Sequence, residues 1–376
     1  FAWKELQLTA FLPPPYDSLA CLCRLVVKAQ NPHQSIKEYG DMKAVRTDCE
    51  LECPGIDAGL RARGVDLVLL PDGIDEAELA RHVSEADLLL TCYTPITAAV
   101  INAAKRLKGI VKYGVGIDAI DIPAAIAREI PVVNIPEYAE QTVAEGAFAL
   151  LLALTRRLPA ITKAVQAESW IWPESRWLGR DIADATLGLV GCGRIGRAMA
   201  RMAQGFRARV LAFDPGANAA ELAALGIEVV KDLHALLAAS DFVSLHAVLN
   251  KETRHLIGAP ELAVMKPGAI LINTARGALI DEGALVEAVL SGHLGGVGLD
   301  VYEREPLSRS GHPLSPLFGR DNVILFPHLT FFTAEAMRRL EEDTLARCFE
   351  VLEGRPVTVR SLDPRLRAQK VGVRFI

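Results

Sequence analysis

The stretch Leu187-Gly-Leu-Val-Gly-Cys-Gly-Arg-Ile-Gly-Arg-Ala-Met-Ala200 decides the fold of this chain. It runs from an apolar segment of strand length into a segment with helical spacing, and Gly191, Gly193 and Gly196 fall at the junction. Glycines at such a turn let the backbone approach a pyrophosphate closely, and the following helix N-terminus offers N–H groups and a partial positive charge. We therefore expect a dinucleotide to bind at this turn.

A carboxylate identifies which dinucleotide to expect. Asp214 follows the next apolar run, Ala208-Arg-Val-Leu-Ala-Phe213, at the separation expected of a residue that binds the adenosine ribose hydroxyls. Asp214 would repel a ribose 2′-phosphate, and Pro215-Gly-Ala217 contains no Arg to bind one. The sequence therefore favours NAD over NADP. A glycine turn followed by a solvated Asp is the other interpretation of the same residues.

Length, charge and cysteine usage bound the class of protein. A chain of 376 residues, 51% hydrophobic and 23% charged, is long for one domain and typical of two. The formal net charge of −5 offers no basic face to a nucleic acid, and no apolar run is long enough to span a bilayer. Seven cysteines, without disulfide density or zinc-site spacing, predict reduced thiols, a cytoplasmic location and no metal site.

Alternating strand-like and helix-like segments predict an α/β fold. They run from Met42 to residue 134 and again from Thr186 to residue 326, which indicates two Rossmann-like, doubly wound domains with parallel sheets. Helices are expected over residues 141–157 and 333–352. The expected domains are an NAD-binding domain over 141–327, inserted in a flavodoxin-like substrate domain of residues 42–140 and 328–365, with 1–41 a poorly structured leader and 366–376 a tail.

Three polar residues each follow an apolar strand, at the end where ligands collect in open α/β sheets. They are Arg276, Glu305 and His328. Reduction of a 2-oxo acid needs a proton donor for the carbonyl oxygen, a role that suits His328, and a carboxylate such as Glu305 orients the imidazole and favours its protonated form. The planar fork of Arg276 suits a substrate carboxylate. Taken singly, each residue also has an ordinary explanation, as a surface Arg, a solvated Glu or a His that caps a turn.

Several motifs in order make the chain similar to the D-isomer-specific 2-hydroxyacid dehydrogenase family. The resemblance covers about Met42 to Leu362 and rests on residues 191–196, 273–281, 298–306 and 327–333, with 112–121 and the helix from Thr142 in support. It implies an NAD-dependent enzyme that interconverts a 2-oxo acid and a D-2-hydroxy acid, with Arg276, Glu305 and His328 as the catalytic residues. It also implies a homodimer formed through the helix from Thr142.

The same resemblance assigns further residues. The implied cofactor contacts beyond the glycines and Asp214 are Arg194, Ile195, Ala247, Thr274, Ala275 and Asp300. Val115 and Gly116 are implied to hold the substrate carboxylate through backbone N–H groups. Asp118 and Asp121 are expected to cap the helix that follows them.

The chain departs from the family pattern at three places. Val248 stands where the family usually has Pro, and Gly146 replaces a His that is common in the dimer helix. Phe331 and Phe332 stand where phosphoglycerate-type members have small residues, which resembles the C-terminal-binding-protein branch, where an aromatic ring lines the substrate pocket. Phe331 is therefore expected to contact an apolar or aromatic 2-oxo acid, although both rings could instead only pack where the domains join.

Two other functions stay open beside the dehydrogenase. The first is an NAD(H)-sensing, corepressor-like binding protein on the same fold, a branch that retains the catalytic trio and carries a long tail with interaction motifs. The second is an enzyme for a phosphorylated or dicarboxylic substrate, which would need additional basic residues near the pocket. Lys112 is the one candidate for that role. Of the three functions, we expect the NAD-dependent 2-hydroxyacid dehydrogenase.

Overall fold

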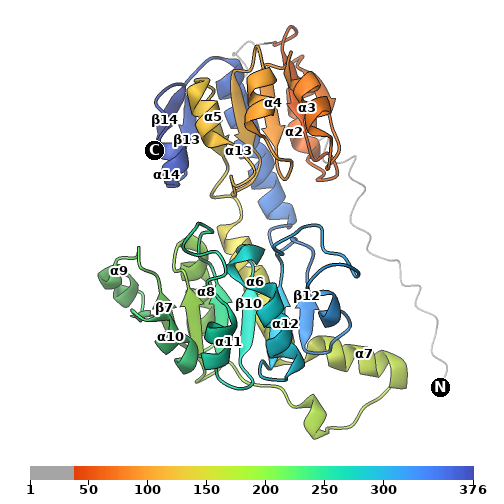
Figure 1. Cartoon of the computed structure of the whole chain (residues 1–376), viewed down its shortest axis with the longest axis vertical. Helices are drawn as coiled ribbons and strands as arrows, with labels where there is room; N and C mark the ends of the chain where they lie inside the picture. The colour runs from red at the N-terminus through yellow and green to blue at the C-terminus, as the bar shows by residue number, and fades with distance from the viewer. Residues whose placement is uncertain (1–37) are drawn as a thin grey trace, which may run out of the picture. The chain divides into compact units, whose positions relative to one another are not determined.

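The computed structural model describes residues 38–376, which form two compact units (Figure 1). Unit 1 comprises residues 38–138 and Met337–Ile376, and unit 2 comprises Ala139–Ala336. Residues 1–37 of the expected leader, 1–41, lie outside the described residues. Among residues 38–376, no helix combines the length and the apolar character needed to cross a membrane.

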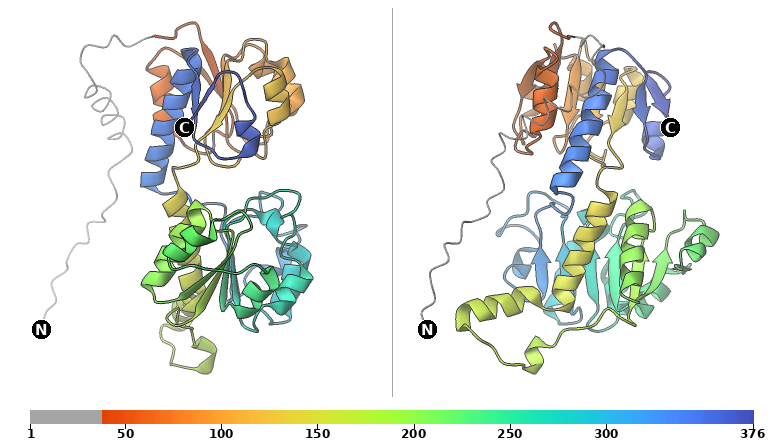
Figure 2. Two further views of the ribbon diagram at one scale, coloured as in Figure 1. Left: turned by 90° about the vertical axis from the view of Figure 1, so that its left-hand side faces the viewer. Right: turned by 180° about the vertical axis from the view of Figure 1, so that it is seen from behind.

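Unit 1 is built on a five-stranded parallel sheet in the order β2-β1-β3-β4-β5, which is the flavodoxin-like order. Helices α3, α4 and α5 cover one face, and α2 and α13 cover the other (Figures 1 and 2). The sheet strands are β1 (Lys43–Arg46), β2 (Asp66–Leu69), β3 (Leu88–Thr91), β4 (Gly109–Lys112) and β5 (Val132–Asn134). The helices are α2 (Pro54–Arg61), α3 (Glu76–Val83), α4 (Ala98–Ala103), α5 (Ile122–Ala127), α13 (Ala334–Leu352) and α14 (Pro364–Arg367). A separate parallel pair, β13 (Val357–Val359) and β14 (Val373–Phe375), includes residues of the expected tail.

The central strands of unit 1 are buried along their whole length, which is why they appear in the sequence as continuous apolar runs. Asp121 caps α5 as expected, because its Oδ1 accepts a hydrogen bond from Ala124 N at 3.0 Å. The expectation for Asp118 is wrong. Its Oδ1 accepts from Arg365 at 3.1 Å, an ion pair with a residue far along the chain.

Unit 2 contains a seven-stranded parallel sheet in the order β12-β11-β10-β9-β6-β7-β8. Counted from β6 this is the dinucleotide-binding order with one additional strand, so the prediction of two Rossmann-like sheets is confirmed. The strands are β6 (Thr186–Val190), β7 (Arg209–Phe213), β8 (Glu228–Val229), β9 (Phe242–Leu245), β10 (Ile270–Asn273), β11 (Gly296–Leu299) and β12 (Val323–Leu325). The helices are α6 (Glu140–Thr155), α7 (Leu158–Glu168), α8 (Arg194–Gly205), α9 (Ala219–Ala224), α10 (Leu233–Ala239), α11 (Ala259–Val264) and α12 (Glu282–Leu290), with short 3₁₀ turns η1 (Ser175–Trp177), η2 (Gly277–Leu279) and η3 (Ser315–Leu317).

Helix α6 lies across β10 and β11 on the face that it shares with α8 (Figure 2, right). Glycines in β11 make room for it, because a Cβ on Gly298 would lie 2.9 Å from Ile272 Cδ1 and 3.2 Å from Leu150 Cβ. Ala144, Ala147 and Leu151 of α6 are fully buried. Burial within unit 2 therefore accounts for the apolar character of the helix from Thr142.

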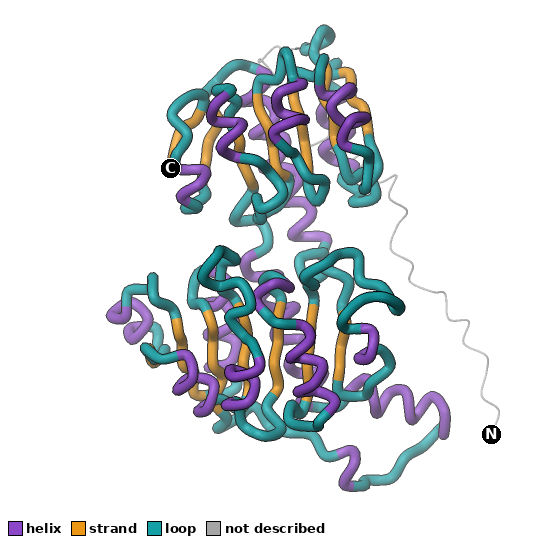
Figure 3. The backbone as a smooth tube through the Cα atoms, in the orientation of Figure 1, coloured by secondary structure: helices purple, strands orange, loops and turns teal. Residues whose placement is uncertain are grey.

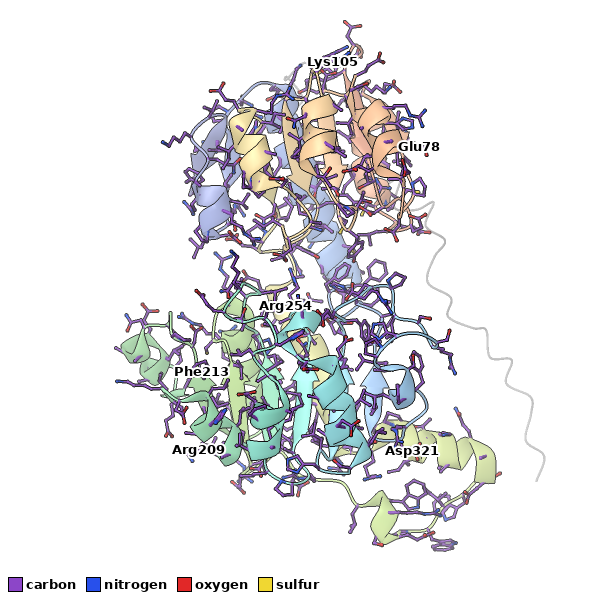
Figure 4. The ribbon with its side chains drawn as sticks, in the orientation of Figure 1. Glu78, Lys105, Arg209, Phe213, Arg254 and Asp321 are labelled. Atoms are coloured by element: carbon purple, nitrogen blue, oxygen red, sulfur yellow. The ribbon has the colours of Figure 1, made fainter. Side chains whose placement is uncertain are left out.

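Between α6 and β6 the chain forms an arm, residues 158–178, that the sequence did not predict. It consists of α7, a largely irregular stretch and η1 (Figure 3). Lys163 of α7 lies 3.5 Å from Asp321, which is labelled in Figure 4. Trp170, Trp172 and Leu178 are 68–72% exposed. Side chains of this size are seldom so exposed, so the arm presents an apolar surface.

Candidate active site

The glycine turn of unit 2 is shaped by close backbone contacts. Gly191 directly follows β6 and has φ +89°, and a Cβ there would lie 2.6 Å from Ala247 N. A Cβ on Gly196 would lie 2.6 Å from Gly191 O. Gly193 differs, because a Cβ there would meet no heavy atom of the described chain within 4 Å. Two glycines are thus required by packing, and the third borders open space.

That open space suits a phosphate. Gly193 is the N-cap of α8, and no side-chain hydrogen bond of the described residues caps this helix. Its first N–H groups and the positive end of the helix dipole are therefore available to an anion. The predicted contact Arg194 is paired with Glu140 at 2.9 Å, and Ile195 is half-buried in the first turn. This geometry fits the pyrophosphate of a dinucleotide.

Asp214 lies at the carboxyl end of β7, beside the turn. Its Oδ2 accepts from Cys192 N at 2.8 Å, and its Oδ1 accepts from Gly216 N at 2.9 Å. The carboxylate thus connects the ends of β6 and β7, a role that the sequence did not reveal. Each carboxylate oxygen can accept a second hydrogen bond, so this arrangement leaves capacity for ribose hydroxyls.

The predicted trio lies at one edge of the sheet of unit 2. Arg276, Glu305 and His328 follow β10, β11 and β12, which are neighbours in parallel register, so their carboxyl ends meet. His328 Nδ1 lies 2.8 Å from Glu305 Oε2. Glu305 Oε1 accepts from Tyr302 N at 3.0 Å. Arg276 Nη1 donates to Ala275 O at 2.6 Å.

The surroundings of Glu305 favour its charged form. Burial alone would raise the pKa of this carboxyl, but hydrogen bonds from His328 and Tyr302 N, together with the charges of His328 and Arg276, hold the pKa below its ordinary value. Arg276 is therefore close enough to act on Glu305 electrostatically. The three predicted side chains form one interacting group.

A buried carboxylate holds the turn that carries His328. Asp300 is 1% exposed and accepts from Leu329 N at 2.8 Å and from Thr330 N at 3.1 Å, and the Thr330 hydroxyl also donates to it. Burial raises the pKa of Asp300 despite these hydrogen bonds. Asp300 was predicted as a cofactor contact. The sequence gives one signal that Asp300 holds the turn after His328, namely its position one residue after β11.

The remaining predicted cofactor contacts lie at the ends of β9 and β10. Ala247 N closely faces Gly191, so this segment borders the glycine turn. Thr274 is 7% exposed, and its Oγ1 has no hydrogen-bond partner among the described residues. A buried unpaired hydroxyl costs about 1–3 kcal/mol, so Thr274 fits a polar group of a ligand. Ala275 N donates to Asn273 Oδ1 at 3.0 Å, which shapes this turn.

The aromatic pair after His328 is divided between interior and surface. Phe331 is 7% exposed, and its ring lies edge-on to His328 with centroids 6.3 Å apart. Phe332 is 46% exposed and packs edge-on against Phe331. Phe331 thus contacts the predicted catalytic imidazole directly.

The predicted substrate loop belongs to unit 1. Val115 is 43% exposed and Gly116 is half-buried, and Val115 O accepts from Asn134 Nδ2 at 2.6 Å. Lys112, the candidate for a phosphorylated substrate, is only 6% exposed. Its Nζ donates to Cys92 O and lies 3.2 Å from Cys92 Sγ. Lys112 is therefore engaged in the interior of unit 1.

Comparisons with known proteins agree with this geometry. Residues 148–330 match the family model of the NAD binding domain of D-isomer specific 2-hydroxyacid dehydrogenases, which confirms the predicted cofactor. A glyoxylate reductase of Korarchaeum cryptofilum is 42% identical over 259 residues, which cover 68% of this chain and 76% of the relative. The D-3-phosphoglycerate dehydrogenase of Mycobacterium bovis is also 42% identical over 68% of this chain, but only 47% of that protein is covered. The chain thus spans about half the length of such relatives.

A solved structure supports the fold over more of the chain. The D-lactate dehydrogenase of Aquifex aeolicus, determined with NAD and lactic acid, is 30% identical to this chain with a TM-score of 0.74. The match covers 83% of this chain and 96% of the solved one. The similarity therefore extends well beyond the NAD-binding domain.

Substituting glycines of the turn should separate folding from cofactor binding. We expect Gly193→Ala to fold normally but to weaken NADH binding by about tenfold or more, because its methyl group would enter the space assigned to the phosphates. Gly191→Ala should be destabilised by more than about 1 kcal/mol, because of its positive φ and backbone contacts. NADH fluorescence titration measures the change in affinity, and thermal unfolding measures the change in stability. Gly205→Ala, at the other end of α8, is the control, and unchanged NADH affinity in Gly193→Ala would contradict the assignment.

His246 should make stability depend on acidity. Burial lowers its pKa from 6.5 to about 4. Between these values the unfolded chain binds a proton that the folded chain does not, so stability falls as the pH falls from about 6.5 to 4, by up to roughly 1.4 kcal/mol per pH unit. In urea unfolding at several pH values, His246→Gln should lose less stability over this range than the parent. Equal losses in the two proteins would disprove this prediction.

Proposed function

The chain belongs to the D-isomer-specific 2-hydroxyacid dehydrogenase family, and from this premise we propose that it is an NAD-dependent oxidoreductase interconverting a 2-oxo acid and a D-2-hydroxy acid. The observation that carries the proposal is the His328–Glu305 contact of 2.8 Å, at the sheet edge where Arg276 also lies. This edge belongs to the unit that holds the glycine turn. The relatives that support it include a glyoxylate reductase and a hydroxypyruvate reductase.

Each member of the trio has a role in the proposed reaction. NADH, when bound, supplies the hydride that reduces the carbonyl carbon. Arg276 binds the substrate carboxylate through its guanidinium fork and stabilises the negative charge that grows on the carbonyl oxygen. His328 donates a proton to that oxygen, and Nε2 is the nitrogen we assign to this step because Nδ1 faces Glu305.

Glu305 orients and charges the imidazole. Its Oε2 fixes the ring through Nδ1, and its negative charge stabilises the imidazolium needed for proton donation. The low pKa of Glu305, which results from hydrogen bonds that outweigh burial, keeps the carboxylate ionised at neutral pH. In the reverse direction the same contact stabilises the proton that His328 accepts.

We propose an apolar or aromatic substrate side chain. Phe331, in edge-on contact with His328, gives the surroundings of the acid–base residue an apolar character. Lys112, the one basic candidate for binding a substrate phosphate, is buried and engaged with Cys92. Both observations favour a 2-oxo acid with an uncharged side chain over a phosphorylated one.

Cysteine chemistry has no part in the proposed reaction. Burial, together with a smaller effect of the neighbouring Asp214, raises the pKa of Cys192 to about 11, so the thiol beside the glycine turn stays protonated. Cys49, Cys53, Cys92 and Cys348 are free thiols as well. Free thiols are typical of reducing compartments, and we propose a cytoplasmic location on this ground.

Turnover of a substrate panel tests the function. NADH oxidation should be measured with glyoxylate, pyruvate, hydroxypyruvate, 2-oxoisocaproate, phenylpyruvate and phosphohydroxypyruvate, with chiral analysis of the product. We expect a D-hydroxy acid and the highest kcat/KM among the apolar substrates. Arg276→Ala should lower turnover by roughly 100-fold or more with NADH affinity unchanged, and Arg276→Lys should recover only part, because an ammonium lacks the fork.

Two outcomes would contradict this proposal. Tight NADH binding without turnover of any 2-oxo acid would favour the corepressor-like alternative over the enzyme. Loss of NADH binding in Arg276→Ala would place this residue in the cofactor site instead of the substrate site.

We also propose a homodimer, now through the arm instead of the helix from Thr142. One face of that helix is buried within its own unit, whereas Trp170, Trp172 and Leu178 are exposed, and Trp is enriched at the centres of interfaces. Light scattering after size exclusion should show a dimer for the parent and a monomer for the double variant Trp170→Ser, Trp172→Ser. The double variant Tyr93→Ser, Phe206→Ser, with exposed aromatic residues outside the arm, is the control. A monomeric parent, or a dimeric arm variant, would overturn the assignment.

A further inference from the structure

The loop that carries Glu305 is held by two buried polar side chains that lie outside the trio. Residues 302–305 follow β11, and Glu305 Oε1 accepts from Tyr302 N within this loop. The conformation of the loop therefore fixes the direction of the carboxylate. Glu282 and His312 are the two side chains that bind its backbone.

Glu282 binds the loop from α12. It is the first residue of that helix and is 6% exposed, and its Oε1 accepts from Glu303 N at 2.9 Å. Acidic side chains are common in the first turn of a helix, where they interact favourably with the helix dipole. The hydrogen bond fixes the peptide between Tyr302 and Glu303.

His312 binds the peptide between Arg304 and Glu305. Its side chain is fully buried, and its Nε2 lies 3.1 Å from Arg304 O. Leu314 N donates to Nδ1 at 3.2 Å, so Nδ1 is the acceptor and Nε2 carries the proton. His312 Nδ1 lies 3.9 Å from Glu282 Oε2, too far for a hydrogen bond. The two side chains therefore hold the loop at different atoms.

Other contacts limit the loop from the remaining sides. A Cβ on Gly277 would lie 1.9 Å from Tyr302 C, so the turn after Arg276 lies directly against the loop. The Glu303 side chain pairs with Arg254, which is labelled in Figure 4, and lies 3.0 Å from His255 Nε2. With these contacts on the outside, Glu282 and His312 supply the hydrogen bonds to the loop backbone from the interior.

We propose that Glu282 and His312 are positioning residues for the Glu305–His328 pair. The proposal rests on the proposed function, because it assigns their effect to the acid–base step. The Glu305–His328 contact depends on a carboxylate held by its own loop, and a displacement of about 1 Å at a catalytic group can cost 10²-fold in rate.

The pH dependence of the reaction should reveal this positioning. The charged and titratable groups that act on Glu305 are His328 and Arg276, and Asp300 and Glu282 act on the neighbouring Tyr302. Hydrogen bonds keep the pKa of Glu305 low against the effect of burial. A loosened loop would weaken those bonds and leave burial dominant, so the pKa of Glu305 would rise. As the pH is lowered, the variant would then lose activity at a higher pH than the parent does.

Paired variants test the proposal. Glu282→Ala removes the acceptor, and Glu282→Gln keeps a carbonyl oxygen in its place. His312→Phe fills the space without a donor, and His312→Gln keeps an N–H for Arg304 O. We expect kcat to fall roughly 10- to 100-fold in the Ala and Phe variants, with NADH affinity within about twofold of the parent. The Gln variants should recover most of this loss. Glu287→Ala, at an exposed position of the same helix, is the control.

A second measurement reports on Glu305 without turnover. Carboxyl ¹³C NMR titration of glutamate-labelled protein, with the signal assigned through Glu305→Gln, should show a higher Glu305 pKa in Glu282→Ala and a value close to that of the parent in Glu282→Gln. The positioning role is wrong if the parent turns over 2-oxo acids and the Ala and Phe variants match it in three quantities. These are kcat, the pH at which activity is lost on acidification, and, for Glu282→Ala, the pKa of Glu305. If the parent turns over no 2-oxo acid, the proposed function fails instead.

Discussion

The backbone contact between Gly277 and Tyr302–Glu303 is the constraint on which the candidate site depends. Parallel strands bring the ends of β10 and β11 to the same edge, but side chains meet there only if the loops that follow lie against each other. A Cβ at position 277 would overlap the neighbouring peptide, so only glycine permits this approach. Arg276 and Glu305 are brought within electrostatic reach by two main chains in contact.

Carboxylates that accept backbone N–H groups organise the irregular segments of unit 2. Asp300 fixes the turn with His328, Glu282 fixes the loop with Glu305, and Asp214 connects β6 to β7 at the glycine turn. Unit 1 contains a similar device, because Asp48 accepts from Cys92 N, Tyr93 N and Thr94 N. A carboxylate can accept several N–H groups at once, so one side chain can order a whole irregular segment.

The sequence predicts this molecule best where a local pattern encodes structure. Apolar runs and glycine spacing were enough for the two Rossmann-like sheets and the glycine turn, and the order of several motifs indicated the family; the structure and comparisons confirm these predictions. The contacts of Asp300, Asp118 and Glu282 were not predictable, because each joins residues about 20 or more positions apart and leaves no periodic signal. The apolar character of the helix from Thr142 does not distinguish a core from an interface, because burial in a core and burial against a partner produce the same pattern. The sequence does not predict the arm, because its irregular stretch has no periodic pattern of apolar residues.

The close fit of α6 has a mechanical consequence for the acid–base residue. A Cβ on Gly146 would lie 2.6 Å from Thr330 Cβ, and Thr330 belongs to the turn that Asp300 holds beside His328. Because position 146 has no side chain, α6 and the turn with Thr330 pack directly against each other. A displacement of α6 would therefore press directly on the turn that follows His328.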